Sequence, residues 1–163
     1  MTPTPPIAPV IEIEIDEAAW TRALPDAAPL ARKAATAAAR LGGDGTIAIL
    51  LTGDERVRDL NARFLGKDAA TNVLAFPASP CAQNHLGDVA LAFGVCAREA
   101  ARQATPLADH LRHLVIHGVL HLLGYDHGTE DQADAMEEVE RDLLAALGVA
   151  DPYAEGDHVQ HGR

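Results

Sequence analysis

Three histidines and a glycine constrain the fold of this chain more than any other feature. They form the string H-x3-H-x2-G-x2-H, with histidines at 117, 121 and 127 and the glycine at 124. Two residues four apart in a helix lie one turn apart on the same face. Gly124 can adopt a positive φ at little cost and end the helix. The string therefore predicts His117 and His121 on one helical face, and a turn that returns His127 to them.

The chemical consequence of this turn is a candidate metal site. A helix that continued would carry residue 127 away, because ten residues of helix span about 15 Å. Three imidazoles with an open fourth position are typical of catalytic zinc, whereas structural sites hold four protein ligands. We therefore expect one Zn²⁺ per chain, bound by His117, His121 and His127. His113 lies one turn earlier, and we expect it to support the ligands from behind or to pack in the core.

The residue after the first histidine bears on the reaction. Metzincin proteases share this spacing, but carry a glutamate there as the general base of peptide hydrolysis. Here the position is Gly118, so that base is missing. A metal that lowers the pKa of bound water still suits a reaction in which the substrate helps, such as RNA cleavage with its own 2′-hydroxyl. Asp126 is the candidate proton acceptor; the alternative is that it only stabilises the turn.

The remaining patterns predict one mixed α/β or α+β domain over residues 10–148. Alternating apolar and acidic residues at 10–16 predict a half-buried strand, and the apolar run 46–52 predicts a central one. Further strands are expected at 72–76 and 86–93. Asp54 and Thr129 are candidate N-caps, the latter with Gln132 in a capping box. We expect about four strands packed with about five helices, and the metal site at the end of a long helix in the C-terminal half.

The charge and the chain ends narrow the class of protein. The net charge of −11 does not suit a general nucleic-acid binder. Eleven acidic residues and one basic residue lie within 126–157, and such a run is usually a solvated face. We expect a disordered proline-rich tail at 1–9 and an acidic, histidine-containing tail at 149–163. No apolar stretch approaches the roughly 20 residues of a membrane span, and two cysteines without a signal peptide favour a cytoplasmic protein.

With these motifs the chain resembles the YbeY family of bacterial endoribonucleases, also called ribosomal RNA maturation factors. The string from His117 to His127 matches the family signature, Gly118 included. The supporting matches are Leu60-Asn61, Gly66-Lys67-Asp68, Thr71-Asn72-Val73-Leu74, Phe76-Pro77 and Leu86-Gly87-Asp88-Val89. The resemblance covers about residues 10–148.

The resemblance implies a four-stranded α/β fold and zinc on the three histidines. It implies cleavage of single-stranded RNA in 3′ end maturation of small-subunit rRNA and in ribosome quality control. The implied partners are this RNA and small-subunit ribosomal proteins, without DNA or membrane. The family usually carries an arginine where this chain has Leu65, about 200° around a helix from Arg63. Arg63, if the helix end unwinds, and Lys67 are the candidate substrate-binding residues.

Two alternatives stay open from the sequence. One is a non-catalytic ribosome-assembly factor with a structural zinc, whose acidic last helix binds a basic ribosomal protein. The other is a zinc hydrolase that acts on a small ester or amide. Cleavage of RNA by metal-replete protein separates both from a nuclease.

Overall fold

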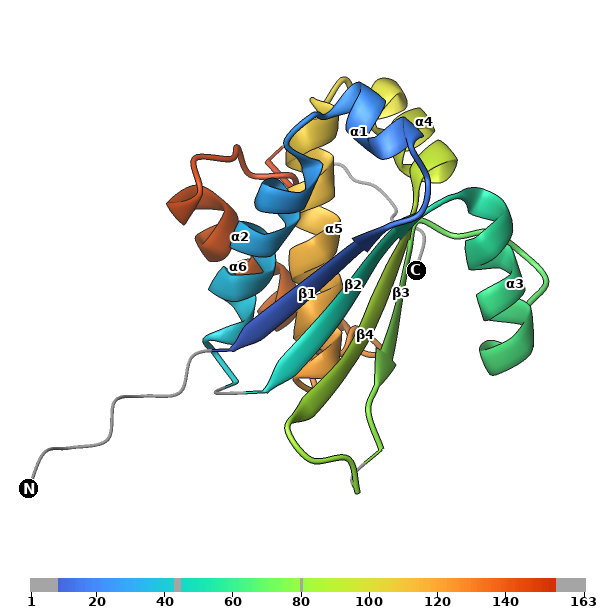
Figure 1. Ribbon diagram of the computed structural model, residues 1–163. Coiled ribbons are helices and arrows are strands. Elements are labelled where there is room, and N and C mark those ends of the chain that lie inside the picture. The colour runs from blue at the N-terminus through green and yellow to red at the C-terminus, as the bar shows by residue number, and fades with distance from the viewer. Residues whose placement is uncertain (1–8, 43–44, 80, 155–163) are drawn as a thin grey trace, which may run out of the picture.

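A computed structural model of the chain describes residues 9–42, 45–79 and 81–154. Within these ranges one four-stranded sheet packs with six helices (Figure 1). The strands are β1 (Val10–Ile15), β2 (Thr46–Thr52), β3 (Val73–Pro77) and β4 (His85–Ala92). The helices are α1 (Ala19–Ala23), α2 (Ala27–Ala39), α3 (Asp54–Leu65), α4 (Phe93–Gln103), α5 (Leu107–Leu122) and α6 (Glu130–Ala146). The predicted mixed α+β architecture is confirmed, with six helices against about five expected.

The sheet is mixed and has the strand order β1-β2-β4-β3. β1, β2 and β4 are parallel, and β3 pairs antiparallel with β4 at the edge. In β1 the exposed residues alternate with Ile11, Ile13 and Ile15, which belong to or pack on the core. This edge strand is half-buried, as its alternating sequence predicted. β2 lies inside the sheet and buries Ile47, Ile49 and Leu51 almost completely.

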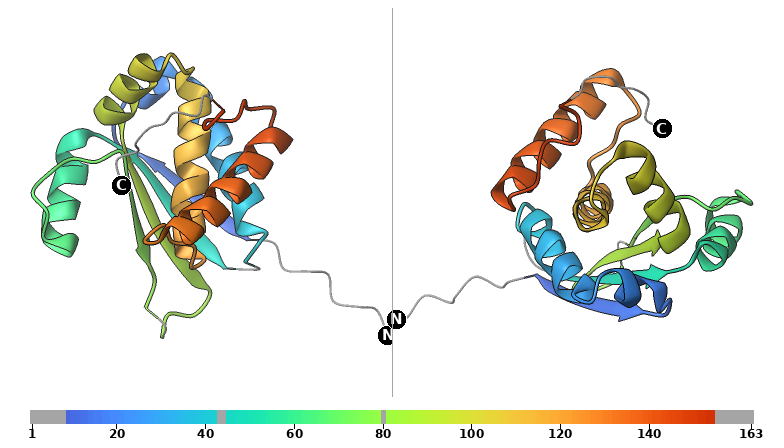
Figure 2. Two further views of the ribbon diagram at one scale, coloured as in Figure 1. Left: turned by 180° about the vertical axis from the view of Figure 1, so that it is seen from behind. Right: turned by 90° about the horizontal axis from the view of Figure 1, so that it is seen from above.

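The sheet separates two groups of helices. Side chains alternate between the faces of a strand, so Val73 and Val89 join the core under α2 and α5, whereas Leu74 and Ala90 join the smaller core under α3. Viewed along the sheet, α3 lies on one side, and α2 and α5 lie on the other with α6 outside them (Figure 2). In the described sheet no further strand lies beyond β3, so the face under α3 and the face under α5 meet at this edge.

Helix α5 approaches the sheet closely at Gly118. A Cβ atom on this residue would lie 2.8 Å from Cγ1 of Val89 and 3.3 Å from Cγ2 of Val73. The position that carries a glutamate in metzincins therefore faces the sheet. The helix ends as predicted, with Gly124 at φ +101° and the Tyr125 amide donating to the Leu120 carbonyl at 3.0 Å.

One of the two predicted helix caps is correct. Thr129 and Gln132 form the expected capping box at the start of α6. The prediction for Asp54 is wrong, because α3 begins at Asp54 itself and Gly53 is the N-cap. The Asp54 carboxylate instead accepts from the Val95 amide in the first turn of α4, at 3.0 Å. A tertiary contact has therefore replaced the local one.

The chain ends are described in part. Residues 1–8 of the expected N-terminal tail and 155–163 of the C-terminal tail lie outside the described ranges. Residues 149–154 return to the body of the protein: Val149 is buried, and Tyr153 packs against His113 of α5. Across the described residues, no helix combines the length and apolar character that crossing a membrane requires.

Candidate metal centre

The three histidines of the string converge at the C-terminal end of α5. One ring nitrogen from each of His117, His121 and His127 lies within 4.8 Å of the other two. The Nε2 atoms of His117 and His121 are 3.2 Å apart. The ring centroid of His127 lies 4.9 Å from that of His121 and 5.5 Å from that of His117. The turn at Gly124 therefore brings the third imidazole to the first two, as the spacing predicted.

The loop that carries His127 is held by its own hydrogen bonds. Asp126 Oδ1 accepts from the backbone amide of His127 at 2.8 Å. Two residues later, Thr129 begins α6 through its capping box. The contact of Asp126 is the turn-stabilising one that the sequence offered as an alternative to proton transfer. Its side chain is exposed, and its negative charge acts to raise the pKa of His121.

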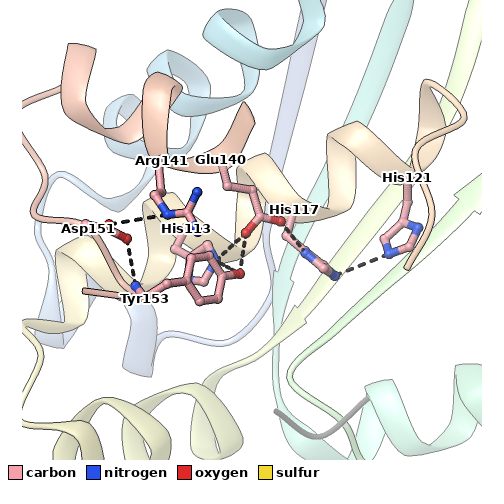
Figure 3. Close-up of polar contacts among 7 residues, drawn as sticks. All are labelled: His113, His117, His121, Glu140, Arg141, Asp151 and Tyr153. Carbon is pink, nitrogen blue, oxygen red and sulfur yellow. Dashed lines mark hydrogen bonds and ion pairs between the residues drawn. The ribbon is translucent and has the colours of Figure 1, made fainter. Parts of the chain in front are cut away.

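A buried carboxylate from α6 lies behind the histidines. Glu140 has no solvent exposure. Its Oε2 accepts from His117 Nδ1 at 2.6 Å, and its Oε1 accepts from His113 Nε2 at 2.8 Å and from the Tyr153 hydroxyl at 2.5 Å (Figure 3). Because Nδ1 of His117 is engaged, its Nε2 is the atom that faces His121. This carboxylate–histidine pairing is the one that orients metal-binding imidazoles in proteins.

The surroundings of His121 favour its neutral form. Burial lowers the pKa of His121, and the charges of His117 and His127 lower it further. Burial acts to raise the pKa of Glu140, but hydrogen bonds from His113 and His117 outweigh it, so that this pKa lies well below its usual range. A neutral ring beside a carboxylate-backed ring is the form that binds a metal ion.

The donor set fits a zinc-like ion. Zinc–nitrogen bonds of 2.0–2.1 Å in a tetrahedron place the nitrogens about 3.4 Å apart, close to the 3.2 Å between His117 and His121. No fourth histidine, cysteine or carboxylate from the described residues joins the group. Three imidazole ligands with a free fourth position are the arrangement of catalytic zinc.

The two candidate substrate-binding residues lie on the α3 side of the sheet. α3 continues through Leu65, and Gly66 ends it at φ +72°. The helix end therefore does not unwind, and Arg63 does not take the place of the side chain at 65. Arg63 lies 3.9 Å from Asp59, and Lys67 follows the glycine in an exposed loop. In the described part of the chain, no direct contact joins either side chain to the three histidines.

Two surface cavities lie away from the histidines. One, of about 610 Å³, runs along α2 and is lined by Arg32, Lys33 and Arg40 among others. The other, of about 630 Å³, is lined by residues that include Arg58 and Asp68. The histidine rings themselves are half-buried. Neither cavity includes them, so the chemistry of the side chains, rather than cavity size, identifies the candidate centre.

Two residues of the centre were missed in the sequence. Glu140 belongs to the acidic run that we expected to be solvated, yet it is buried. The helical spacing could have predicted its burial, because Glu140 lies on the same face of α6 as Ala133, Met136 and Leu144, the other buried residues of this helix. Tyr153 falls in the expected tail, and no spacing relates it to His113.

A second, separate polar cluster lies under α4. His110 is buried, and its Nε2 donates to Glu99 Oε1 at 2.9 Å. Asn72 Nδ2 donates to the same oxygen at 3.0 Å. Burial acts to raise the pKa of Glu99, but these two hydrogen bonds dominate and lower it. These contacts give His110 a structural role in the described part of the chain.

Comparison with known proteins gives a consistent result. A family model described as "Endoribonuclease YbeY" matches residues 11–148. "Endoribonuclease YbeY" of Maricaulis maris is 51% identical over 150 residues, covering 90% of this chain and 93% of the relative. That of Paramagnetospirillum magneticum is 49% identical and covers 89% and 96%. The solution structure of TM1509 from Thermotoga maritima matches the fold with a TM-score of 0.56 and 22% identity, over 94% of this chain and all of that one.

Proposed function

Because the chain belongs to the YbeY family of endoribonucleases, we propose that it hydrolyses phosphodiester bonds of single-stranded RNA with zinc bound by His117, His121 and His127. The observation that carries this proposal is the approach of three imidazole nitrogens to within 4.8 Å. The imidazole donors favour zinc over magnesium or calcium, which prefer oxygen ligands.

The chain's own residues have distinct roles in this proposal. When bound, the ion supplies a Lewis acid and makes water a better nucleophile near neutral pH. Glu140 fixes the ring of His117 so that its Nε2 points to the centre. Asp126 accepts a proton from the attacking group, which is water or the RNA 2′-hydroxyl, through its exposed carboxylate. Asp126 also holds the turn. Arg63 and Lys67 contact phosphates of the RNA beyond the centre.

The biological setting is part of the same proposal. Family membership supports a role in ribosomal RNA processing, which we place at the 3′ end of small-subunit rRNA and in ribosome quality control, in the cytoplasm. Small-subunit ribosomal proteins are the proposed protein partners. The exposed acidic residues of α6 complement basic proteins of this kind.

Cleavage of RNA at defined metal content tests the nuclease. Metal-replete protein is incubated with a single-stranded rRNA fragment, and zinc per chain is measured by elemental analysis. We expect wild type to bind one zinc and to cut, and His121→Ala to do neither. His85→Ala is the matched control, because His85 lies on β4 and pairs with Asp88 at 3.3 Å. Equal cleavage by wild type and His121→Ala would contradict the proposal.

The same assay separates the alternatives. Zinc binding without RNA cleavage would favour the assembly factor, and hydrolysis of acyl substrates alone would favour the other hydrolase. Asp126→Asn tests the proton acceptor, because the amide oxygen can still accept from the His127 backbone. We expect this variant to keep its zinc and to cut slowly with an altered pH profile; an unchanged rate leaves Asp126 with the turn only.

A further inference from the structure

The side chain of Phe64 is exposed although it is large and apolar. It is 64% exposed at the end of α3, more than the other exposed large hydrophobics, Val10, Leu41 and Leu65, of the described ranges. Its ring meets Phe76 edge-on, with centroids 5.7 Å apart and planes at 64°. This contact holds the ring on one side and leaves most of its surface to solvent. A single exposed apolar side chain is ordinary on a protein surface, so its neighbours decide whether it binds a ligand.

Phe64 and the three histidines lie on opposite faces of the sheet and are linked through the end of edge strand β3. Phe76, its partner, belongs to the edge strand β3. At the end of that strand, a Cβ atom on Gly87 would meet both the carbonyl oxygen of Phe76 and Cδ2 of Leu122. Leu122 follows His121 in α5. The exposed ring and the histidines therefore reach the same end of β3 from its two sides.

Two cations accompany the ring: Arg63 in the last turn of α3, and Lys67 in the loop that follows the helix. Arg63, with a side chain 66% exposed, precedes Phe64, and Lys67 follows the helix end. The Lys67 amide donates to the carbonyl of Asn61 at 3.2 Å, and the Asn61 side chain donates to the carbonyl of Ala69 at 2.9 Å. These bonds fix the chain on both sides of Gly66. Proteins that bind single-stranded nucleic acid combine such cations with aromatic rings on which bases stack.

We propose that Phe64 is a stacking platform for one unpaired base of the RNA, beside Arg63 and Lys67 as phosphate contacts. The RNA then passes round the β3 edge to the histidines. This inference rests on the proposed function, since it assigns a subsite to the same substrate. A protein partner fits less well, because a stable protein interface buries about 800 Å² on each side and only Phe64 and Leu65 are exposed large apolar residues here.

Two substitutions distinguish stacking from mere apolar contact. Phe64→Leu keeps an apolar side chain without a ring, and Phe64→Trp keeps a larger ring. Binding of a short unstructured RNA to metal-replete protein is measured by anisotropy of a dye on the RNA. We expect Phe64→Leu to weaken binding about 5- to 150-fold, the usual effect of losing one stacked base, and Phe64→Trp to bind at least as tightly as wild type.

Fluorescence gives an independent readout in the same titration. Trp20 is the sole tryptophan of the chain and is fully buried. RNA should therefore leave wild-type emission unchanged and quench the indole introduced by Phe64→Trp. Leu41→Ala is the control, because Leu41 is 53% exposed just after α2. Its RNA affinity should equal that of wild type, and all variants should keep one zinc and the wild-type Tm.

The outcomes test the stacking platform and the nuclease activity independently of each other. Equal affinity of Phe64→Leu and wild type, or equal losses in Phe64→Leu and Phe64→Trp, overturns the stacking platform even if RNA is cut. The loss in Phe64→Leu alone, with quenching in Phe64→Trp, supports it even if the protein never cleaves RNA, which would refute only the nuclease. Wild type that binds no RNA overturns both.

Discussion

Replacement of Glu140 by glutamine should weaken metal binding while the fold persists. Its two carboxylate oxygens accept from His117 at 2.6 Å and from His113 at 2.8 Å. Glutamine has the same shape but one acceptor oxygen, so one ring loses its partner. Loss of the carboxylate behind a metal-binding histidine lowers metal affinity about 10- to 100-fold, or by about 1.4 to 2.7 kcal/mol. The unpaired ring also removes about 1–3 kcal/mol from the free energy of unfolding.

Competition with a chromophoric chelator measures this effect. Zinc is titrated into apo-protein and chelator at 25 °C and pH 7, and the dissociation constant is obtained from the chelator absorbance. Glu138→Gln is the matched control, because it removes the same charge from an exposed position of the same helix. We expect Glu138→Gln to bind zinc like wild type, and Glu140→Gln to bind it at least tenfold more weakly.

Two results would refute this reasoning. Equal zinc affinity of folded Glu140→Gln and wild type would mean that His117 is oriented without the carboxylate. Equal losses of zinc affinity in Glu140→Gln and Glu138→Gln would mean that the effect comes from the overall charge of α6.

Three further predictions concern packing, acid stability and the third ligand. Gly118→Ala places a methyl group 2.8 Å from Val89 Cγ1. The cost of overpacking, about 1–3 kcal/mol, exceeds the gain of about 1 kcal/mol in helix propensity, so the urea midpoint of unfolding should fall. A raised midpoint would contradict the close packing of α5 on the sheet. Glu99 has a lowered pKa in the folded protein. The free energy of unfolding that wild type gains over Glu99→Gln should therefore be complete above the ordinary pKa of about 4.3, and should vanish as the pH falls through the folded pKa. Urea unfolding between pH 3 and 7 checks this, and a difference that does not depend on pH would refute it. His127→Ala should hold well under one zinc per chain after gel filtration, whereas full occupancy would remove His127 from the site.

The parts of this protein that were predictable are those governed by local spacing. A helical period of 3.6 residues and one glycine determine where His117, His121 and His127 lie relative to one another. Alternation along β1 and the apolar run of β2 likewise report burial directly. These patterns need no knowledge of which element packs against which.

The parts that were missed depend on contacts between distant segments. Asp54 has the residue type of a local N-cap, but its carboxylate accepts from a backbone amide in the first turn of α4. Glu140 looks like one member of an acidic run until its place in the buried stripe of α6 is considered. Which face of the sheet receives α3, and hence Arg63, follows from chain topology rather than from any motif.

The support behind the three proposed metal ligands comes from α6 and the stretch of described chain after it. Glu140 lies 13 residues after His127, and Tyr153 another 13 later. Since translation proceeds from the N-terminus, all three imidazoles are synthesised before either supporting group. The contact that orients His117 therefore forms only after α6 has been synthesised and has packed against α5.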